Sequence, residues 1–134
     1  MKPISKLKKE LDKYFSQYIR LRYATDLGIS TCYTCGKQDH YKRLQAGHFQ
    51  SRKHTATRWH EYNVQVQCVK CNMFDHGQQW EFGNKLDAQY GKGTSHDLFV
   101  LSKTTMKMSR SDYEQEIRYY KTHVENLKNE KCIE

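Results

Sequence analysis

The chain has 134 residues and a formal net charge of +8, and hydrophobic residues make up only 37% of it. This length fits a single domain, residues 1–134, whose modest core favours stabilisation by a bound metal. No apolar run is long enough to span a membrane, and the first residues do not resemble a secretory signal. The sequence therefore argues against a membrane protein or a membrane partner, and we expect a cytoplasmic protein.

The positive charge is concentrated in the first half of the chain. Residues 1–72 hold fourteen Lys and Arg against five acidic residues, whereas residues 73–134 hold nine against ten. Lys and Arg bind phosphates by displacing condensed counterions from nucleic acid. This distribution favours a nucleic-acid partner, and a basic surface that only keeps the protein soluble is the open alternative.

The chain begins with a predicted helix, followed by two predicted strands. Residues 5–24 predict an amphipathic helix, because apolar side chains recur there at three- and four-residue steps. Residues 43–49 and 63–67 predict short strands, and the polar residues 50–62 between them predict a loop.

The second half of the chain is predicted to be helical. A helix is expected to begin near Asn72, and further helices are expected within residues 95–130. Ser111 and Glu114 have the spacing of a capping box, which predicts the start of the last helix. No repeat or long linker divides the chain.

Four cysteines form two Cys-x-x-Cys pairs, and they are Cys32, Cys35, Cys68 and Cys71. Two such pairs in a chain without a signal peptide are typical of one tetrahedral structural zinc ion. A closed site with four thiolates has no open position for chemistry, so His48 and Asn72 remain free for another role. A redox pair of Cys32 and Cys35 and a disulfide framework are the alternatives.

Residues 5–130 resemble the phage NinG family, also called Rap recombination proteins. The resemblance is densest from Cys32 to Gly77 and is carried by the string AGHFQSRKHTATRWHEYNVQVQCVKCN. Its order of strand with histidine, loop, strand, cysteine pair and asparagine is similar to the ββα-metal core of HNH-type nucleases. The Cys71-Asn72 step is similar to that of endonuclease VII-type junction-resolving enzymes. The resemblance implies an α+β fold, with a zinc-stabilised, treble-clef-type ββα-metal core at residues 30–90 and flanking N- and C-terminal helices.

The same resemblance implies a DNA endonuclease that hydrolyses phosphodiester bonds in branched recombination intermediates, such as Holliday junctions or D-loops. It also implies a phage or prophage protein that acts in the cytoplasm of a bacterial host. Cleavage of two strands would suit a homodimer, in which the terminal helices form the interface or else cover the single core. The rival function is a non-catalytic zinc module that binds DNA or RNA through basic contacts.

Three side chains match the family's catalytic positions. Hydrolysis of a phosphodiester needs a base, and we predict that His48 is this base rather than a packed or zinc-supporting histidine. Asn63 matches the middle asparagine of HNH sites, which orients the base, and an Asx-turn is the alternative. Asn72 matches the position of a ligand for catalytic Mg²⁺ or Mn²⁺ beside His48, and a plain N-cap is the alternative.

One position departs from the HNH pattern. Many HNH enzymes place an aspartate directly before the base, and here that position is Gly47, which has no side chain to bind a metal. A second ligand would come from water or from another oxygen, for which Asp75 and Glu81 are candidates. The basic loop supplies the predicted DNA contacts, which are Arg52, Lys53, His54 and Arg58.

Overall fold

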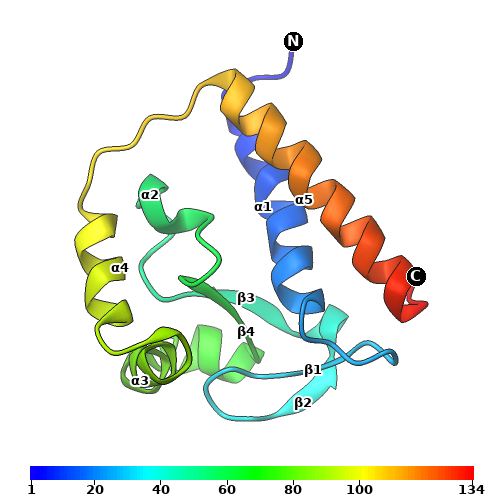
Figure 1. Cartoon of the computed structure of the whole chain (residues 1–134), viewed down its shortest axis with the longest axis vertical. Coiled ribbons are helices and arrows are strands. Elements are labelled where there is room, and N and C mark those ends of the chain that lie inside the picture. Colours follow the sequence, from blue (N-terminus) through cyan, green and yellow to red (C-terminus); the bar gives the residue numbers. More distant parts are fainter.

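The structure is a computed structural model that describes residues 1–134 and combines helices with two small antiparallel sheets (Figure 1). In chain order the elements are α1 (Ile4–Leu21), β1 (Ile29–Thr31), β2 (Gln38–His40), η1 (Tyr41–Arg43), β3 (Gln45–His48), α2 (Thr55–Arg58), β4 (Val64–Gln67), η2 (Lys70–Phe74), α3 (Gln79–Tyr90), α4 (Thr94–Ser102) and α5 (Arg110–Lys131). None of the helices is both long and apolar enough to cross a membrane. The predicted α+β class is confirmed.

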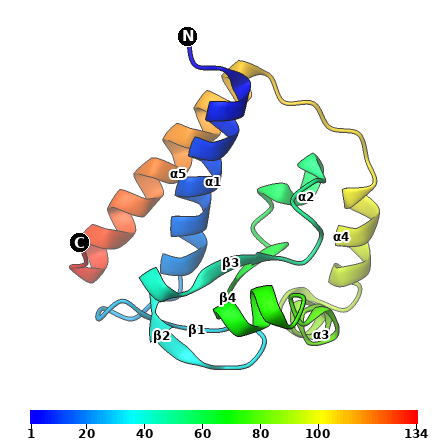
Figure 2. The ribbon, with the colours of Figure 1, turned by 180° about the vertical axis from the view of Figure 1, so that it is seen from behind.

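The first and last helices, α1 and α5, lie side by side and run in the same direction (Figures 1 and 2). Their apolar faces form a core cluster in which Phe15 packs edge-on against Tyr120, with the ring centroids 4.9 Å apart. Val64 of β4 belongs to the same cluster. The apolar faces of the terminal helices therefore cover the core of their own chain.

The hairpin of β3 and β4 lies at the centre of the fold, between the α1 and α5 pair and the α3 and α4 pair (Figure 2). In this antiparallel pairing Gln45 lies opposite Gln67. Because side chains alternate along a strand, Gln45 and Gly47 point to one face, whereas Ala46 and His48 point to the other. The second face is turned toward α1, where Ala46 packs against the core cluster of the terminal helices.

The last helix begins two residues earlier than its predicted capping box. Ser109 is the N-cap, its hydroxyl accepts from the amide of Asp112 at 3.1 Å, and the Asp112 carboxylate accepts from the amide of Ser109 at 2.9 Å. Ser111 and Glu114 have the same spacing, so this signal alone does not select between the two pairs. The earlier start brings Arg110 against the main-chain oxygen of Lys2.

The helix expected near Asn72 is also different in the structure. A short π-helix, η2, surrounds Asn72, whose amide donates to the carbonyl of Cys68 at 3.0 Å. The backbone then takes left-handed conformations at His76, Gly77 and Gln78 before α3 begins. Asn72 is therefore inside a π-turn and is not an N-cap. Two features absent from the predicted elements are the β1 and β2 hairpin and the short helix α2 inside the expected loop.

Candidate zinc centre and candidate active site

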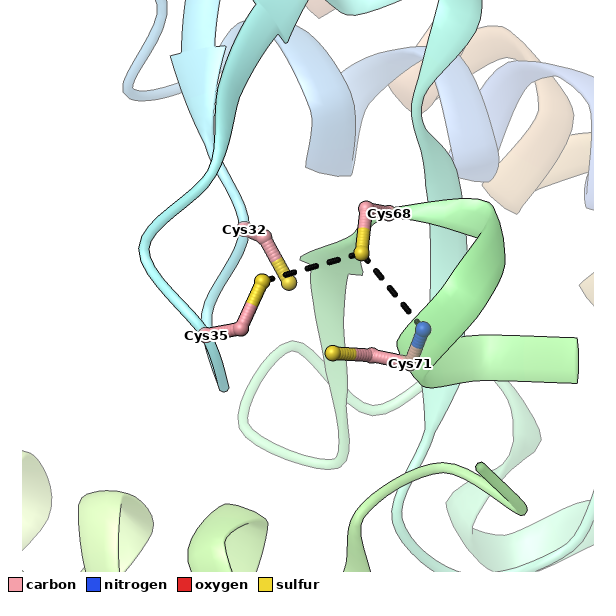
Figure 3. A group of neighbouring side chains, drawn as sticks. All are labelled: Cys32, Cys35, Cys68 and Cys71. Atoms are coloured by element: carbon pink, nitrogen blue, oxygen red, sulfur yellow. Dashed lines mark hydrogen bonds between the residues drawn. The ribbon is translucent and has the colours of Figure 1, made fainter. Parts of the chain in front are cut away.

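The four predicted zinc cysteines converge at one point (Figure 3). Cys32 and Cys35 lie in the turn between β1 and β2, whereas Cys68 and Cys71 lie at the junction of β4 and η2. All four sulfur atoms lie within 4.8 Å of one another, and those of Cys35 and Cys68 are 3.7 Å apart. A tetrahedron with zinc–sulfur bonds of about 2.3 Å has edges of roughly 3.8 Å. The arrangement therefore fits one tetrahedral zinc ion.

The surroundings of the cluster act on the thiols of Cys71 and Cys32 in opposite directions. Burial raises the pKa of Cys71 to about 12, with a contribution from the crowded thiols, whereas hydrogen bonds outweigh the effect of burial and lower the pKa of Cys32 to about 6. The amide of Cys71 points at the sulfur of Cys68 at 3.4 Å. Zn²⁺ binds thiols as thiolates and compensates the negative charge that this crowding disfavours. Cys132 is exposed at the end of α5, outside this group of four.

His48 lies at the end of β3 in a defined tautomer. Its ring nitrogen Nε2 lies 2.9 Å from the main-chain oxygen of Arg58. A carbonyl oxygen can only accept, so this hydrogen bond assigns the proton of the neutral ring to Nε2 and leaves Nδ1 as an acceptor. The imidazole is therefore oriented by the backbone, and one ring nitrogen remains able to take a proton.

The half-buried position of His48 keeps its ring neutral. Burial lowers the pKa of His48 to about 4, and the hydrogen bond to the Arg58 carbonyl opposes this only in part. The ring borders a cavity of about 160 Å³, whose lining residues are Asp12, Phe15, Ser16, Ala46, His48 and Arg52. At neutral pH the side chain is thus unprotonated beside a small polar cavity.

A model of one protein family, described as the bacteriophage lambda NinG protein, matches residues 1–130. The chain belongs to the NinG family. No curated protein and no solved structure matches the chain. The match spans both the cysteine group and the His48 cavity, so both belong to the part of the chain that this NinG family model describes.

Asn63 is fully buried directly before β4 in this NinG-family protein. Its side-chain nitrogen donates to the carbonyls of Gln50 and Thr57 at 3.1 and 3.0 Å, and its side-chain oxygen accepts from the amide of Gln50 at 2.7 Å. All of these contacts reach residues of the segment between β3 and β4, which carries the Arg58 carbonyl. Asn63 therefore braces this segment and does not face the cavity of His48, whose lining it does not join.

Asn72 does not join His48 in a common site. Its side-chain nitrogen donates to the side-chain oxygen of Gln45 at 2.8 Å, at the other end of β3. Gln45 and His48 are three residues apart, which places them about 10 Å apart along the strand and on opposite faces of it. The predicted metal site formed by Asn72 and His48 is therefore not assembled in this structure.

Gln67 occupies the space that a side chain at position 47 would need. A Cβ atom on Gly47 would lie 1.8 Å from the side-chain oxygen of Gln67. The Gln67 amide nitrogen donates to Thr34 and to the carbonyl of Gly77 at 3.0 and 2.9 Å, so the orientation of the amide group is fixed. Asp75, one candidate for the missing ligand, instead accepts from Lys70 at 3.0 Å.

The four basic residues predicted to bind DNA lie in different environments. The side chain of Arg52 is 62% exposed at the His48 cavity, and Lys53 is exposed nearby. Lys53 and His54 line a further depression together with Lys103. Arg58 differs from its prediction, because its side chain is only 19% exposed and is bound to Asp12 at 2.6 Å. Arg52, Lys53 and His54 thus border surface depressions, and Arg52 is also paired with Asp12 at 2.9 Å, whereas Arg58 is engaged inside the protein.

The structure adds residues that no local sequence pattern marks. Asp12 of α1 reaches the cavity of His48 from a helix that is otherwise rich in lysine. Lys103 joins Lys53 and His54 from a segment fifty residues further along the chain. Their roles depend on tertiary contacts, and an acid or a lysine on a predicted helix gives no signal of such contacts.

Proposed function

We propose that this NinG-family protein is a zinc-stabilised DNA endonuclease that hydrolyses phosphodiester bonds in branched recombination intermediates. The observation that carries the proposal is the tautomer of His48, whose Nε2 is held by the Arg58 carbonyl while Nδ1 remains an acceptor. The NinG family, its phage origin and the basic first half of the chain support DNA as the substrate. The strands β3 and β4 and the helical turn after Cys71 correspond to the ββα-metal core in this proposal.

In the proposed reaction, Nδ1 of His48 takes a proton from water. The water oxygen attacks the phosphorus atom, and the bond from phosphorus to the leaving sugar oxygen breaks. That oxygen takes a proton from solvent, and His48 later returns its own proton to solvent. Arg52 at the same cavity neutralises negative charge that develops on the phosphate. The incoming phosphate also raises the low pKa of His48 toward neutrality, because a nearby negative charge favours the imidazolium.

The zinc ion has a structural role in this account. It joins the turn between β1 and β2 to the end of β4, and two hydrogen bonds support the same junction. Tyr33 donates its amide to the carbonyl of Val66 at 2.8 Å, and Gln67 donates to Thr34 at 3.0 Å. The zinc centre therefore stabilises the hairpin that carries His48, and a closed site of four cysteines provides no open position for substrate.

The described residues do not form a ready site for catalytic Mg²⁺ or Mn²⁺ beside His48. Gly47 offers no ligand, Asn72 lies at the other end of β3, and the Asp12 carboxylate is already bonded to Arg52 and Arg58. We therefore assign no step of the reaction to a metal ion. Dependence on Mg²⁺ or Mn²⁺, expected from the HNH resemblance, is part of the test below.

The lack of a ready site for Mg²⁺ or Mn²⁺ beside His48 favours the rival function, a zinc module that binds nucleic acid without cutting it. A cleavage assay separates the two functions. Zinc-loaded protein is incubated with a four-way DNA junction and with the matched linear duplex, each with Mg²⁺, with Mn²⁺ or with EDTA, and strands are resolved on denaturing gels. The proposal predicts cuts in the junction with at least one of the two cations, and binding without cuts under every condition would favour the rival.

A further inference from the structure

The carboxylate of Asp12 is the most heavily bonded side chain near His48. Its Oδ1 accepts from Arg58 Nε at 3.2 Å and from Trp59 Nε1 at 2.9 Å. Its Oδ2 accepts from Arg58 Nη2 at 2.6 Å and from Arg52 Nη2 at 2.9 Å. The pair with Arg58 is therefore bidentate, which fixes the guanidinium in both position and angle.

Arg58 links Asp12 to His48. Its side chain is bonded to Asp12, and its main-chain carbonyl is bonded to His48. Arg58 ends the short helix α2, and its carbonyl is the acceptor for His48 Nε2 at 2.9 Å. Trp59, the next residue, is also bonded to Asp12, and its ring packs edge-on against Tyr113 of α5 at 5.7 Å. The helices α1 and α5 thus contact the residues before and after the Arg58 carbonyl, α1 through Asp12 and α5 through Tyr113.

The same segment is held from its other side by Asn63, which bonds to Gln50 and to the carbonyl of Thr57. Asn63 contacts the residue immediately before Arg58, whereas Asp12 contacts Arg58 and Trp59 directly. The contacts of Asp12 differ from a surface ion pair, because its side chain is only 22% exposed and both carboxylate oxygens accept hydrogen bonds. Saturation by four donors also leaves it poorly suited to bind a metal ion.

We propose that Asp12 is a positioning residue of the nuclease site: it fixes Arg58 and, through the Arg58 carbonyl, the orientation and tautomer of His48. This inference rests on the proposed role of His48 as the base. It assigns the helix pair of α1 and α5 a second task besides covering the core, since α1 carries Asp12 and α5 supports Trp59. Neither Asp12 nor Trp59 touches the substrate in this proposal.

The experiment uses the tautomer of His48 as a signal that does not depend on cleavage. Two-bond ¹H–¹⁵N spectra of the full-length, zinc-loaded protein distinguish a ring protonated at Nε2 from one protonated at Nδ1, and His48→Gln assigns the signal among the histidines. The wild type is expected to show only the Nε2-protonated ring. Asp12→Asn is expected to show a mixture of tautomers and at least a tenfold lower kcat, with zinc content unchanged.

Two further variants complete the test. Arg58→Lys keeps the positive charge but loses the bidentate bond, so it is expected to reproduce the Asp12→Asn spectrum and to decide the question if Asp12→Asn does not fold. Glu10→Gln removes an exposed ion pair with Lys2 from the same helix and is expected to behave as the wild type.

A pure Nε2-protonated His48 in Asp12→Asn, or in Arg58→Lys if Asp12→Asn does not fold, would overturn the inference. If the wild type does not cleave DNA, the proposed function fails, while the spectra still decide whether Asp12 positions His48. A change of the His48 tautomer in Asp12→Asn and Arg58→Lys, but not in Glu10→Gln, would support the positioning role whether or not the wild type cleaves DNA.

Discussion

The side chain of Gln67 passes so close to Gly47 that no other residue fits at position 47 without a rearrangement. A Cβ atom there would lie 1.8 Å from the side-chain oxygen of Gln67 and 2.6 Å from its amide carbon. Gln67 is held in this position by Thr34, next to the zinc centre, and by the carbonyl of Gly77. The absence of a side chain at Gly47 therefore matches the packing of Gln67 in this chain.

Gly47→Ala should destabilise the protein by about 2 to 3 kcal/mol, because Gln67 must move and give up buried hydrogen bonds. Urea unfolding followed by circular dichroism measures this change. The double variant Gly47→Ala/Gln67→Ala is the control, since it removes the clashing side chain. The double variant should lose clearly less stability than the two single variants added together, and simple additivity would contradict the contact.

Cys35→Ser should abolish stoichiometric zinc binding and lower the thermal unfolding temperature. The sulfur of Cys35 lies 3.7 Å from that of Cys68, as expected for two ligands of one ion. Metal analysis by mass spectrometry and a thermal melt measure the two effects. Cys132→Ser is the matched control, because Cys132 is exposed and outside the group of four. Retention of one zinc ion per chain by Cys35→Ser would refute the four-cysteine site.

The stability of the folded protein should decrease as the pH falls below the ordinary pKa of a histidine side chain. The pKa of His48 is about 4 in the folded protein against 6.5 for an ordinary histidine, so the unfolded chain binds the proton more tightly. The effect of this pKa difference is small at neutral pH, and protonation of the unfolded chain lowers the free energy of unfolding by about 2 kcal/mol between pH 7 and pH 5. Chemical unfolding of the wild type and of His48→Gln over this range isolates the effect. An equally steep loss in His48→Gln would assign it to other groups.

Arg52 and Arg58 should respond differently to substitution. Arg52→Gln should weaken DNA binding and reduce the slope of log Kd against log salt concentration by about one, because Arg52 is largely exposed. Arg58→Gln should leave that slope unchanged and cost about 1 to 2 kcal/mol of stability, because it leaves Asp12 partly unpaired. Fluorescence anisotropy at several salt concentrations measures the slope. A reduced slope in Arg58→Gln would return Arg58 to the set of phosphate contacts.

The sequence predicted best the features that depend on local spacing. The two Cys-x-x-Cys pairs converge as expected, because each pair needs only a tight turn and a tetrahedral zinc site needs both pairs at one point. The 3.6-residue period placed the first and last helices close to their observed bounds. The two strands next to His48 and Cys68 were also located, although the register that places Gln45 opposite Gln67 was not predictable from spacing.

The features that were missed depend on contacts between distant segments. Asp12 and Arg58 are forty-six residues apart in the chain, and no local pattern links an acid on one helix to an arginine in a later turn. The π-turn around Asn72 is closed by a hydrogen bond from the main-chain amide of Asp75 to the carbonyl of Lys70 at 2.8 Å, whereas helix propensity alone predicts an ordinary helix start. The Asn72 side chain bonds to Gln45, at the end of β3 away from His48.

The proposed role of His48 as the base is tested most directly by single-turnover cleavage of a four-way DNA junction by the wild type and by His48→Gln. Glutamine keeps a donor for the Arg58 carbonyl but cannot take a proton from water. The account predicts that His48→Gln cleaves about 10² to 10⁴ times more slowly, with zinc content and DNA affinity unchanged. Cleavage by His48→Gln at the rate of the wild type would contradict it.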